Sequence, residues 1–282
     1  MELQVLLNTI QNLMSDVKVT SQTVQKGNET LVGISIGSGD VRPIMYLKNY
    51  ENLFEKEGYL AVAKQMIEDY KQVGSPKLNA DFNEFSKYAK DNLILCIAPF
   101  GTNNGNVTVP YLDLELYFRI DMKNAGVPDG TCKVTEQMFK IWNITKETLI
   151  DAALERSNFV TESMREMMIR MMLEDGVPEE FIEEIKKDTS PDQVIFSNET
   201  KLYGASAIYD KSILKEVADK YKSDLYIIPS SIHEVLLVST QFGNKEDMDD
   251  MVRTVNRTEL QPSEVLSDHA YIFRRDTMDI EW

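Results

Sequence analysis

The residues best suited to chemistry lie in one short polar segment, 230–234, between two apolar runs. Two hydroxyls, an imidazole and a carboxylate follow one another there: Ser230, Ser231, His233 and Glu234. A serine activated by a histidine, with a carboxylate to orient the ring, is the set that nucleophilic hydrolysis uses. Polar side chains at the mouth of a strand turn are also well placed to act on a ligand. The segment is therefore a candidate hydrolase-like site.

The spacing of these residues argues against the simplest form of that site. Neighbouring residues of a strand point to opposite faces, so Glu234 cannot orient the ring of His233. A carboxylate from elsewhere would have to approach, and Asp268, Asp113 and Asp121 are the candidates.

A structural turn is the competing interpretation of the same segment. No glycine stands beside Ser230 or Ser231 to help form an oxyanion hole. Serine hydroxyls in turns commonly bond to nearby backbone groups. We therefore expect His233 to serve structure or ligand positioning rather than to act as a general base.

Other catalytic and cofactor motifs are missing from the sequence. The glycines match no phosphate-binding loop, no dinucleotide fingerprint and no hydrolase elbow. The two histidines, His233 and His269, are too far apart for a His-x-x-x-His metal site, and Cys96 and Cys132 have no cysteine nearby. We expect no metal, no cofactor and no disulfide.

A row of methionines forms a second candidate site, in the segment 161–187. Five of them repeat at the spacing of one helix face: Met164, Met167, Met168, Met171 and Met172. Apolar helix faces usually pack inward, so we expect the row to contact other protein atoms. The alternative is an adaptable docking surface, for which methionine is well suited, with Met164, Met168 and Met171 as binding residues.

The composition restricts the partners. The 282 residues carry a formal net charge of −16, which repels phosphate backbones and disfavours direct nucleic-acid binding. No apolar run approaches the roughly 18 residues of a membrane span, and the N-terminal segment lacks the features of a signal peptide. We expect a cytoplasmic protein that binds another protein and does not contact a membrane; its oligomeric state is left open.

Helical and strand patterns alternate irregularly along the chain, which predicts an α+β fold with mixed or antiparallel sheets flanked by helices. Among the predicted strands are 93–99, 111–121, 193–197 and 205–209, with a strand pair at 224–229 and 235–240. The polar loop 101–106 suggests two lobes, 1–104 and 105–282, with the methionine-rich helical segment 161–187 in the second.

The sequence also resembles a protein family. Five segments carry the resemblance: 43–47 (Pro-Ile-Met-Tyr-Leu), 204–207 (Gly-Ala-Ser-Ala), 228–235 (Ile-Pro-Ser-Ser-Ile-His-Glu-Val), 251–256 (Met-Val-Arg-Thr-Val-Asn) and 265–271 (Val-Leu-Ser-Asp-His-Ala-Tyr). They are similar to an uncharacterised family, a domain of unknown function found in gut-dwelling anaerobic Gram-positive bacteria and their mobile elements. The resemblance implies a bacterial or phage-associated cytoplasmic protein, and no activity or catalytic residue.

Three functions are compatible with these patterns. The first is a non-enzymatic binding or regulatory protein that engages a protein partner through its acidic surface. The second is a hydrolase-like enzyme that uses Ser231 and His233 with a carboxylate. The third is an acidic inhibitor that mimics nucleic acid on a basic host protein.

Overall fold

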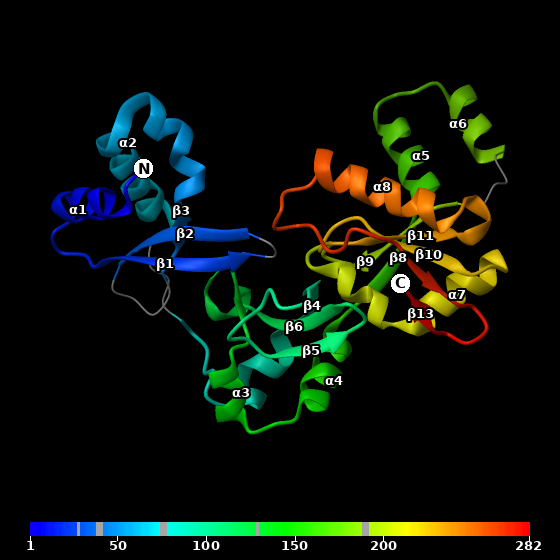
Figure 1. Cartoon of the computed structure of the whole chain (residues 1–282), viewed down its shortest axis with the longest axis horizontal. Helices are drawn as coiled ribbons and strands as arrows, with labels where there is room; N and C mark the ends of the chain where they lie inside the picture. Colours follow the sequence, from blue (N-terminus) through cyan, green and yellow to red (C-terminus); the bar gives the residue numbers. More distant parts are fainter. Residues whose placement is uncertain (27–28, 38–41, 74–77, 128–129, 188–191) are drawn as a thin grey trace. The chain divides into compact units, whose positions relative to one another are not determined.

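The computed structural model of the chain describes residues 1–26, 29–37, 42–73, 78–127, 130–187 and 192–282 (Figure 1). It has an α+β fold with three sheets, and the strands along each sheet are antiparallel. The predicted fold class is therefore confirmed. The chain divides into two compact units: residues Met1–Phe82 with Asp121–Cys132, and residues Asn83–Ile120 with Lys133–Trp282.

The first unit contains a three-stranded sheet and two long helices. The strands run in the order β1-β2-β3, and apolar side chains of β2 pack with the helices, including Ile34 against Leu6, Ile10 and Met66. Gly58 lies at a positive φ of 75° and kinks the second long helix. The elements are β1 (Val19–Lys26), β2 (Glu29–Ile36), β3 (Ile44–Tyr46), α1 (Leu3–Leu13), α2 (Glu51–Val73), and the 3₁₀ helices η1 (Leu47–Tyr50) and η4 (Lys123–Ala125).

A four-stranded sheet has the order β4-β6-β5, with β7 paired to β6. Helix α4 packs against β4. The strands are β4 (Leu93–Pro99), β5 (Thr108–Tyr111), β6 (Leu114–Asp121) and β7 (Thr131–Lys133). The nearby helices are the π-helix η2 (Phe85–Ala89), the 3₁₀ helix η3 (Lys90–Asn92), α3 (Glu136–Trp142) and α4 (Lys146–Arg156).

The structure of this sheet corrects one predicted strand and shows where the loop predicted as the boundary between two lobes lies. The segment 111–121 is not one half-exposed strand, because Leu112, at φ 57°, and Asp113 turn the chain between β5 and β6. Both faces of β6 are covered, since Glu115 is 4% and Tyr117 5% exposed. The loop 101–106 joins β4 to β5 within this sheet, so residues 104 and 105 fall inside the second compact unit.

The largest sheet has six strands in the order β13-β12-β10-β11-β9-β8. Helix α8 buries Met248 and Val252 against Tyr226 and Val238 of the sheet. The strands are β8 (Phe159–Ser163), β9 (Val194–Asn198), β10 (Leu225–Pro229), β11 (Val235–Ser239), β12 (Tyr271–Phe273) and β13 (Ile280–Glu281). The helices are α5 (Met164–Glu174), α6 (Glu179–Lys187), α7 (Lys211–Tyr221), α8 (Lys245–Thr258), and the 3₁₀ helices η5 (Gly204–Tyr209) and η6 (Thr240–Phe242).

Several of the strands predicted in this unit are confirmed, and the one predicted at 205–209 is wrong. The strand 93–99 and the pair at 224–229 and 235–240 are confirmed as β4, β10 and β11. The strand predicted at 205–209 is wrong, because this segment is the 3₁₀ helix η5. Its small residues let the backbone approach β4 closely, and the buried Ser206 hydroxyl donates to the Leu95 carbonyl at 2.8 Å.

Candidate functional site: a methionine-lined groove

Two short helices, α5 and α6, form a hairpin that follows the edge strand β8. Ser163 is the N-cap of helix α5, and its hydroxyl accepts a hydrogen bond from the Glu166 amide at 3.0 Å. The Ser163 hydroxyl donates to the Asp192 carboxylate, which also accepts the Arg165 amide at 3.2 Å. Asp192 lies two residues before β9, so this carboxylate connects the start of the hairpin to the sheet.

The methionine face of α5 is only partly covered, which corrects the expectation that it packs inward: Met164, Met167 and Met172 are half-buried. Helix α5 has no buried residue, and Met168 and Met171 are 46% and 55% exposed. On α6 only Ile182 is buried, and Phe181 is 57% exposed. The periodicity correctly located the helix and its apolar face. The face is partly open because, among the described elements, the strand β8 and the short helix α6 make the main contacts with α5.

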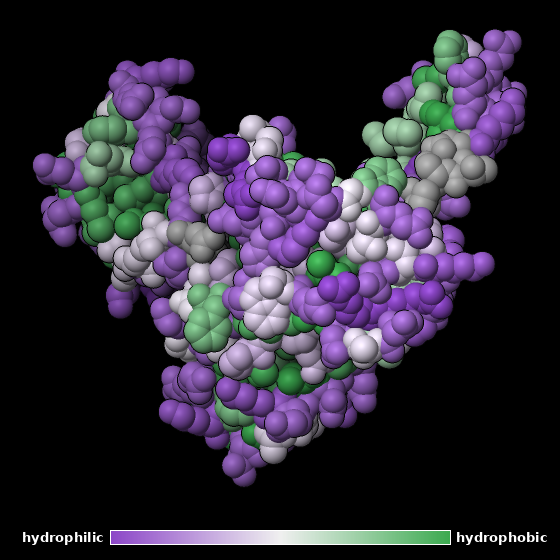
Figure 2. Space-filling view, turned by 45° about the vertical axis from the view of Figure 1, so that its right-hand side comes forward, coloured by the Kyte–Doolittle hydropathy of each residue, from purple (hydrophilic) through white to green (hydrophobic). Residues whose placement is uncertain are grey.

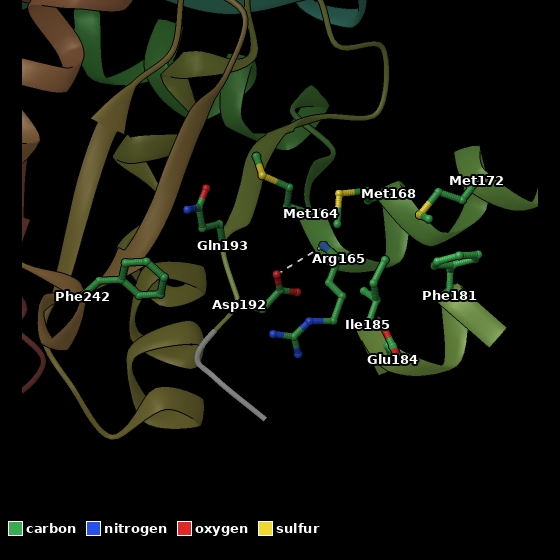
Figure 3. Close-up of a pocket in the computed structure, with 10 residues that line it drawn as sticks. All are labelled: Met164, Arg165, Met168, Met172, Phe181, Glu184, Ile185, Asp192, Gln193 and Phe242. Carbon is green, nitrogen blue, oxygen red and sulfur yellow. Dashed lines mark hydrogen bonds between the residues drawn. The ribbon is translucent and has the colours of Figure 1, made fainter. Parts of the chain in front are cut away.

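Exposed and half-buried side chains of these helices surround a groove with a volume of about 600 Å³ (Figure 3). From α5 it is lined by every fourth residue: Met164, Met168 and Met172. Phe181 and Ile185 of α6 lie opposite, and Phe242 of η6 stands at the far end. In Figure 2 the α5–α6 hairpin, at the upper right, presents hydrophobic residues among hydrophilic ones.

The predicted binding residues are only partly those of the groove. Met164 and Met168 line it, whereas Met171 is not part of its lining. Met172 takes that place, because residues at i, i+4 and i+8 form one continuous ridge of a helix. The helical spacing could have indicated either set, since 171 and 172 lie on adjoining parts of the same face.

Polar groups border the groove. Arg165, Glu184, Asp192 and Gln193 contribute to its lining. The Tyr221 hydroxyl is a buried polar atom without a hydrogen-bond partner in the part of the chain that is described. Burial raises the pKa of Tyr221, and the Asp192 carboxylate adds to this rise while Arg165 opposes it. The groove therefore joins an apolar floor to a charged edge.

The segment 230–234 forms a turn that bonds to backbone groups. The Ser231 hydroxyl accepts the His233 amide at 3.0 Å, and the Ser231 amide donates to the Glu234 carbonyl at 3.2 Å. The imidazole Nδ1 of His233 accepts the Tyr203 amide at 3.1 Å. The Ser197 hydroxyl donates to the His233 carbonyl at 2.7 Å. These bonds place the turn beside the entry to η5.

The candidate catalytic carboxylates lie elsewhere. Asp268 accepts a hydrogen bond from Asn256 at 2.9 Å. Asp113 contacts the other histidine, with its Oδ2 2.9 Å from His269 Nε2. Asp121 accepts the Lys123 amide at 2.8 Å. Among the hydrogen bonds of the described residues, none joins Ser230 or Glu234 to the ring of His233.

The pairing of Asp113 with His269 forms a polar cluster that sequence reasoning missed. The second Asp113 oxygen accepts the Tyr271 hydroxyl at 2.8 Å. Burial raises the pKa of Tyr271, and the Asp113 charge contributes to the increase. The cluster links the β5–β6 turn to the start of β12 across 156 positions of sequence, a separation that no local pattern reveals.

The two cysteines are free thiols that differ in burial. Cys96 is buried in β4, and burial raises the pKa of its thiol to about 12, so the thiolate that acts as a nucleophile is scarce. Cys96 and Cys132 form no disulfide. Within the described ranges, no three His, Cys, Asp or Glu side chains are grouped in a way that would hold a metal ion.

The chain belongs to a family of unknown function, described as Family of unknown function (DUF5688), whose model matches residues 3–275. This confirms the predicted membership of an uncharacterised family, while the origin in gut anaerobes and mobile elements stays a prediction. No curated protein and no solved structure matches this sequence. Of the helices in the described residues, none has both the length and the apolar character required to cross a membrane.

Proposed function

We propose that the chain is a non-enzymatic binding protein that holds an apolar segment of a partner protein in the groove between α5 and α6. The observation that carries this proposal is the exposure of the groove's apolar side chains, including Met168 and Phe181. Contiguous exposed apolar surface that is bordered by polar residues marks interaction sites. Methionine suits such a surface because its unbranched, polarizable side chain adapts to varied partners.

The dimensions of the groove fit an amphipathic helix. At about 1.5 Å of rise per residue, the ridge from Met164 to Met172 is roughly 12 Å long. Its three methionines recur about every 6 Å, as do apolar side chains one turn apart on a partner helix. Helix-in-groove binding uses anchors at i, i+3, i+4 and i+7 over this length. The groove thus matches about two turns of a bound helix.

The polar turn at 230–234 supports the non-enzymatic interpretation. His233 Nδ1 is engaged by the Tyr203 amide, and the Ser231 hydroxyl is engaged by the His233 amide. A general base must reach the proton that it removes, and a serine nucleophile needs such a base. These contacts suit a structural turn better than a hydrolase site.

The class and location of the partner complete the proposal. A net charge of −16 disfavours a nucleic-acid ligand and favours a protein with basic character. We place the interaction in the cytoplasm of a bacterium or in the setting of a bacterial mobile element, as the family resemblance implies.

A matched pair of variants tests the binding site. The probe is a fluorescently labelled neutral helical peptide with leucines on one face and glutamines on the other, followed by anisotropy. Met168→Asn should weaken binding about tenfold, or roughly 1.4 kcal/mol, because the anchor loses apolar contact. Met171→Asn, which alters an exposed methionine of the same helix outside the groove, should bind as the unaltered chain does.

Two results would contradict the proposal. The first is no measurable binding of the peptide at millimolar concentrations. The second is equal binding by the unaltered chain and by Met168→Asn, because the groove would then contribute nothing.

A further inference from the structure

The edge of the groove carries carboxylates beside its apolar floor. Glu184 and Asp192 belong to the lining itself. The first turn of α6 adds Glu179 and Glu180. Between positions 161 and 187 the sequence has eight acidic and four basic side chains. The excess of acidic over basic residues that marks the whole chain is thus also present in this segment.

The carboxylates at the groove are little neutralised by the described residues. Glu183, one position before Glu184, pairs with Lys186 at 2.9 Å. Glu184 has no ion pair within the described part of the chain. Asp192 accepts a hydroxyl and a backbone amide, which leaves its negative charge in place. Arg165 also lines the groove and offsets part of this charge.

We infer that the occupant of the groove is a basic amphipathic helix of a partner protein, with apolar residues toward the methionines and lysines or arginines toward Glu184 and Asp192. The inference rests on the proposed function and adds the chemistry of the partner. Opposite charges at the edge of an interface speed association and select the partner. The apolar contacts hold the helix, and the acidic edge selects a cationic one.

Other occupants fit the charges less well. A second copy of this chain would bring another −16 charges to an acidic surface, and such self-repulsion keeps proteins apart. A small apolar ligand would make no use of the carboxylates. A basic helix satisfies both the apolar floor and the acidic edge.

Two peptides with the same leucine face separate the charge effect from the apolar one. One peptide has lysines on its polar face and the other has glutamines. At low salt the lysine peptide should bind the full chain at least about tenfold more tightly, since unit charges near a protein surface interact strongly. The difference should shrink toward physiological salt, where the Debye length falls to about 8 Å.

Matched charge variants locate the effect. Glu184→Gln should reduce the ratio between the affinities for the two peptides by about threefold or more, because one attractive carboxylate is lost. Glu183→Gln changes the net charge by the same amount on the same helix, outside the groove lining. It should therefore reduce the ratio between the affinities for the two peptides much less.

The outcomes distinguish this inference from the proposed function. Equal affinity for both peptides, lost in Met168→Asn, would overturn the basic partner and leave the binding groove intact. A concentration-dependent dimer that Met168→Asn abolishes would show a second copy as the occupant and also overturn the inference. Failure of both peptides to bind would reject the groove as a helix-binding site.

Discussion

At the scale of single residues, the roles of the two histidines depend on their partners. The ring of His233 accepts a hydrogen bond from the backbone amide of Tyr203, the residue directly before η5. The ring of His269 instead contacts the carboxylate of Asp113. Residue types alone favoured His233 as the reactive histidine because serines and a glutamate lie beside it. The hydrogen bonds assign it to the support of a turn.

Replacing His233 should therefore affect stability. We expect His233→Ala to lower the free energy of unfolding by roughly 1–3 kcal/mol, because the Tyr203 amide loses its acceptor. Urea unfolding followed by circular dichroism measures this change. His233→Asn, which keeps a possible acceptor, should recover part of the loss. A fully stable His233→Ala variant would contradict the structural role.

Local spacing could reveal the residue types of the turn at 230–234 and no more. The Tyr203 amide lies 30 positions before His233, and Asp113 lies 156 positions before His269. Such pairings come from the packing of strands and 3₁₀ helices, which no short motif encodes. The turn itself could be predicted from the sequence, because serine hydroxyls in turns bond to nearby backbone groups.

At the scale of secondary-structure elements, periodicity predicted the helix of the methionines and its apolar face correctly. It could not show what would cover that face, because an inward face and a docking face have the same spacing. The break between α5 and α6, at Gly176-Val177-Pro178, has a local cause. Gly176 adopts a positive φ of 72°, and proline cannot continue a helix.

The exposed face makes a prediction about stability. Met168→Asp should change the free energy of unfolding by less than about 1 kcal/mol, because the side chain is already half in solvent. Met248→Asp, on the buried face of α8, should cost more than about 3 kcal/mol. Thermal and urea unfolding of both variants provide the comparison. A cost of several kcal/mol for Met168→Asp would mean that the groove is closed.

The strand β10 is fastened at its start by a carboxylate, which predicts a pH effect. Asp224 accepts the Arg275 amide at 2.9 Å and the Arg274 guanidinium at 3.0 Å. The backbone hydrogen bond and then Arg274 lower the pKa of Asp224. A lowered pKa in the folded chain stabilises it above the ordinary pKa of aspartate, and this stabilisation is lost as the pH falls through the lowered value.

Asp224→Asn should therefore lose roughly 1 kcal/mol of stability at neutral pH, a figure reduced for the partial exposure of the ion pair. The difference from the unaltered chain should shrink as the pH falls through the lowered pKa of Asp224, because the native carboxylate is then itself protonated. Urea unfolding at neutral and acidic pH checks both points. An equal difference at the two pH values would exclude this carboxylate as the cause.

At the scale of the whole molecule, the alternation of helical and strand patterns predicted the α+β class, and a polar loop suggested two lobes. The first unit combines residues Met1–Phe82 with Asp121–Cys132, two segments separated by a strand-rich stretch of the second unit. A polar loop such as 101–106 marks a local break in regular structure. It contains no information on which distant segments pack together.

The net charge of −16 also makes a prediction for the whole molecule. Like charges repel in the compact state, so screening should stabilise the fold. Raising the salt from about 10 mM to about 150 mM shortens the Debye length from about 30 Å to about 8 Å. The thermal midpoint should rise by a few degrees, which corresponds to a gain of about 1 kcal/mol in the free energy of unfolding. Scanning calorimetry in NaCl and KCl at equal ionic strength tests this, and a falling midpoint would contradict it.

The most direct test of the binding groove is NMR spectroscopy of the methionine methyl groups, titrated with the lysine-faced helical peptide. Assigned signals identify which methionines the peptide touches. The proposed site predicts that the signals of Met164, Met168 and Met172 shift together and saturate, while those of Met171 and Met251 stay in place. Shifts confined to methionines outside the groove, or no shifts at saturating peptide, would contradict it.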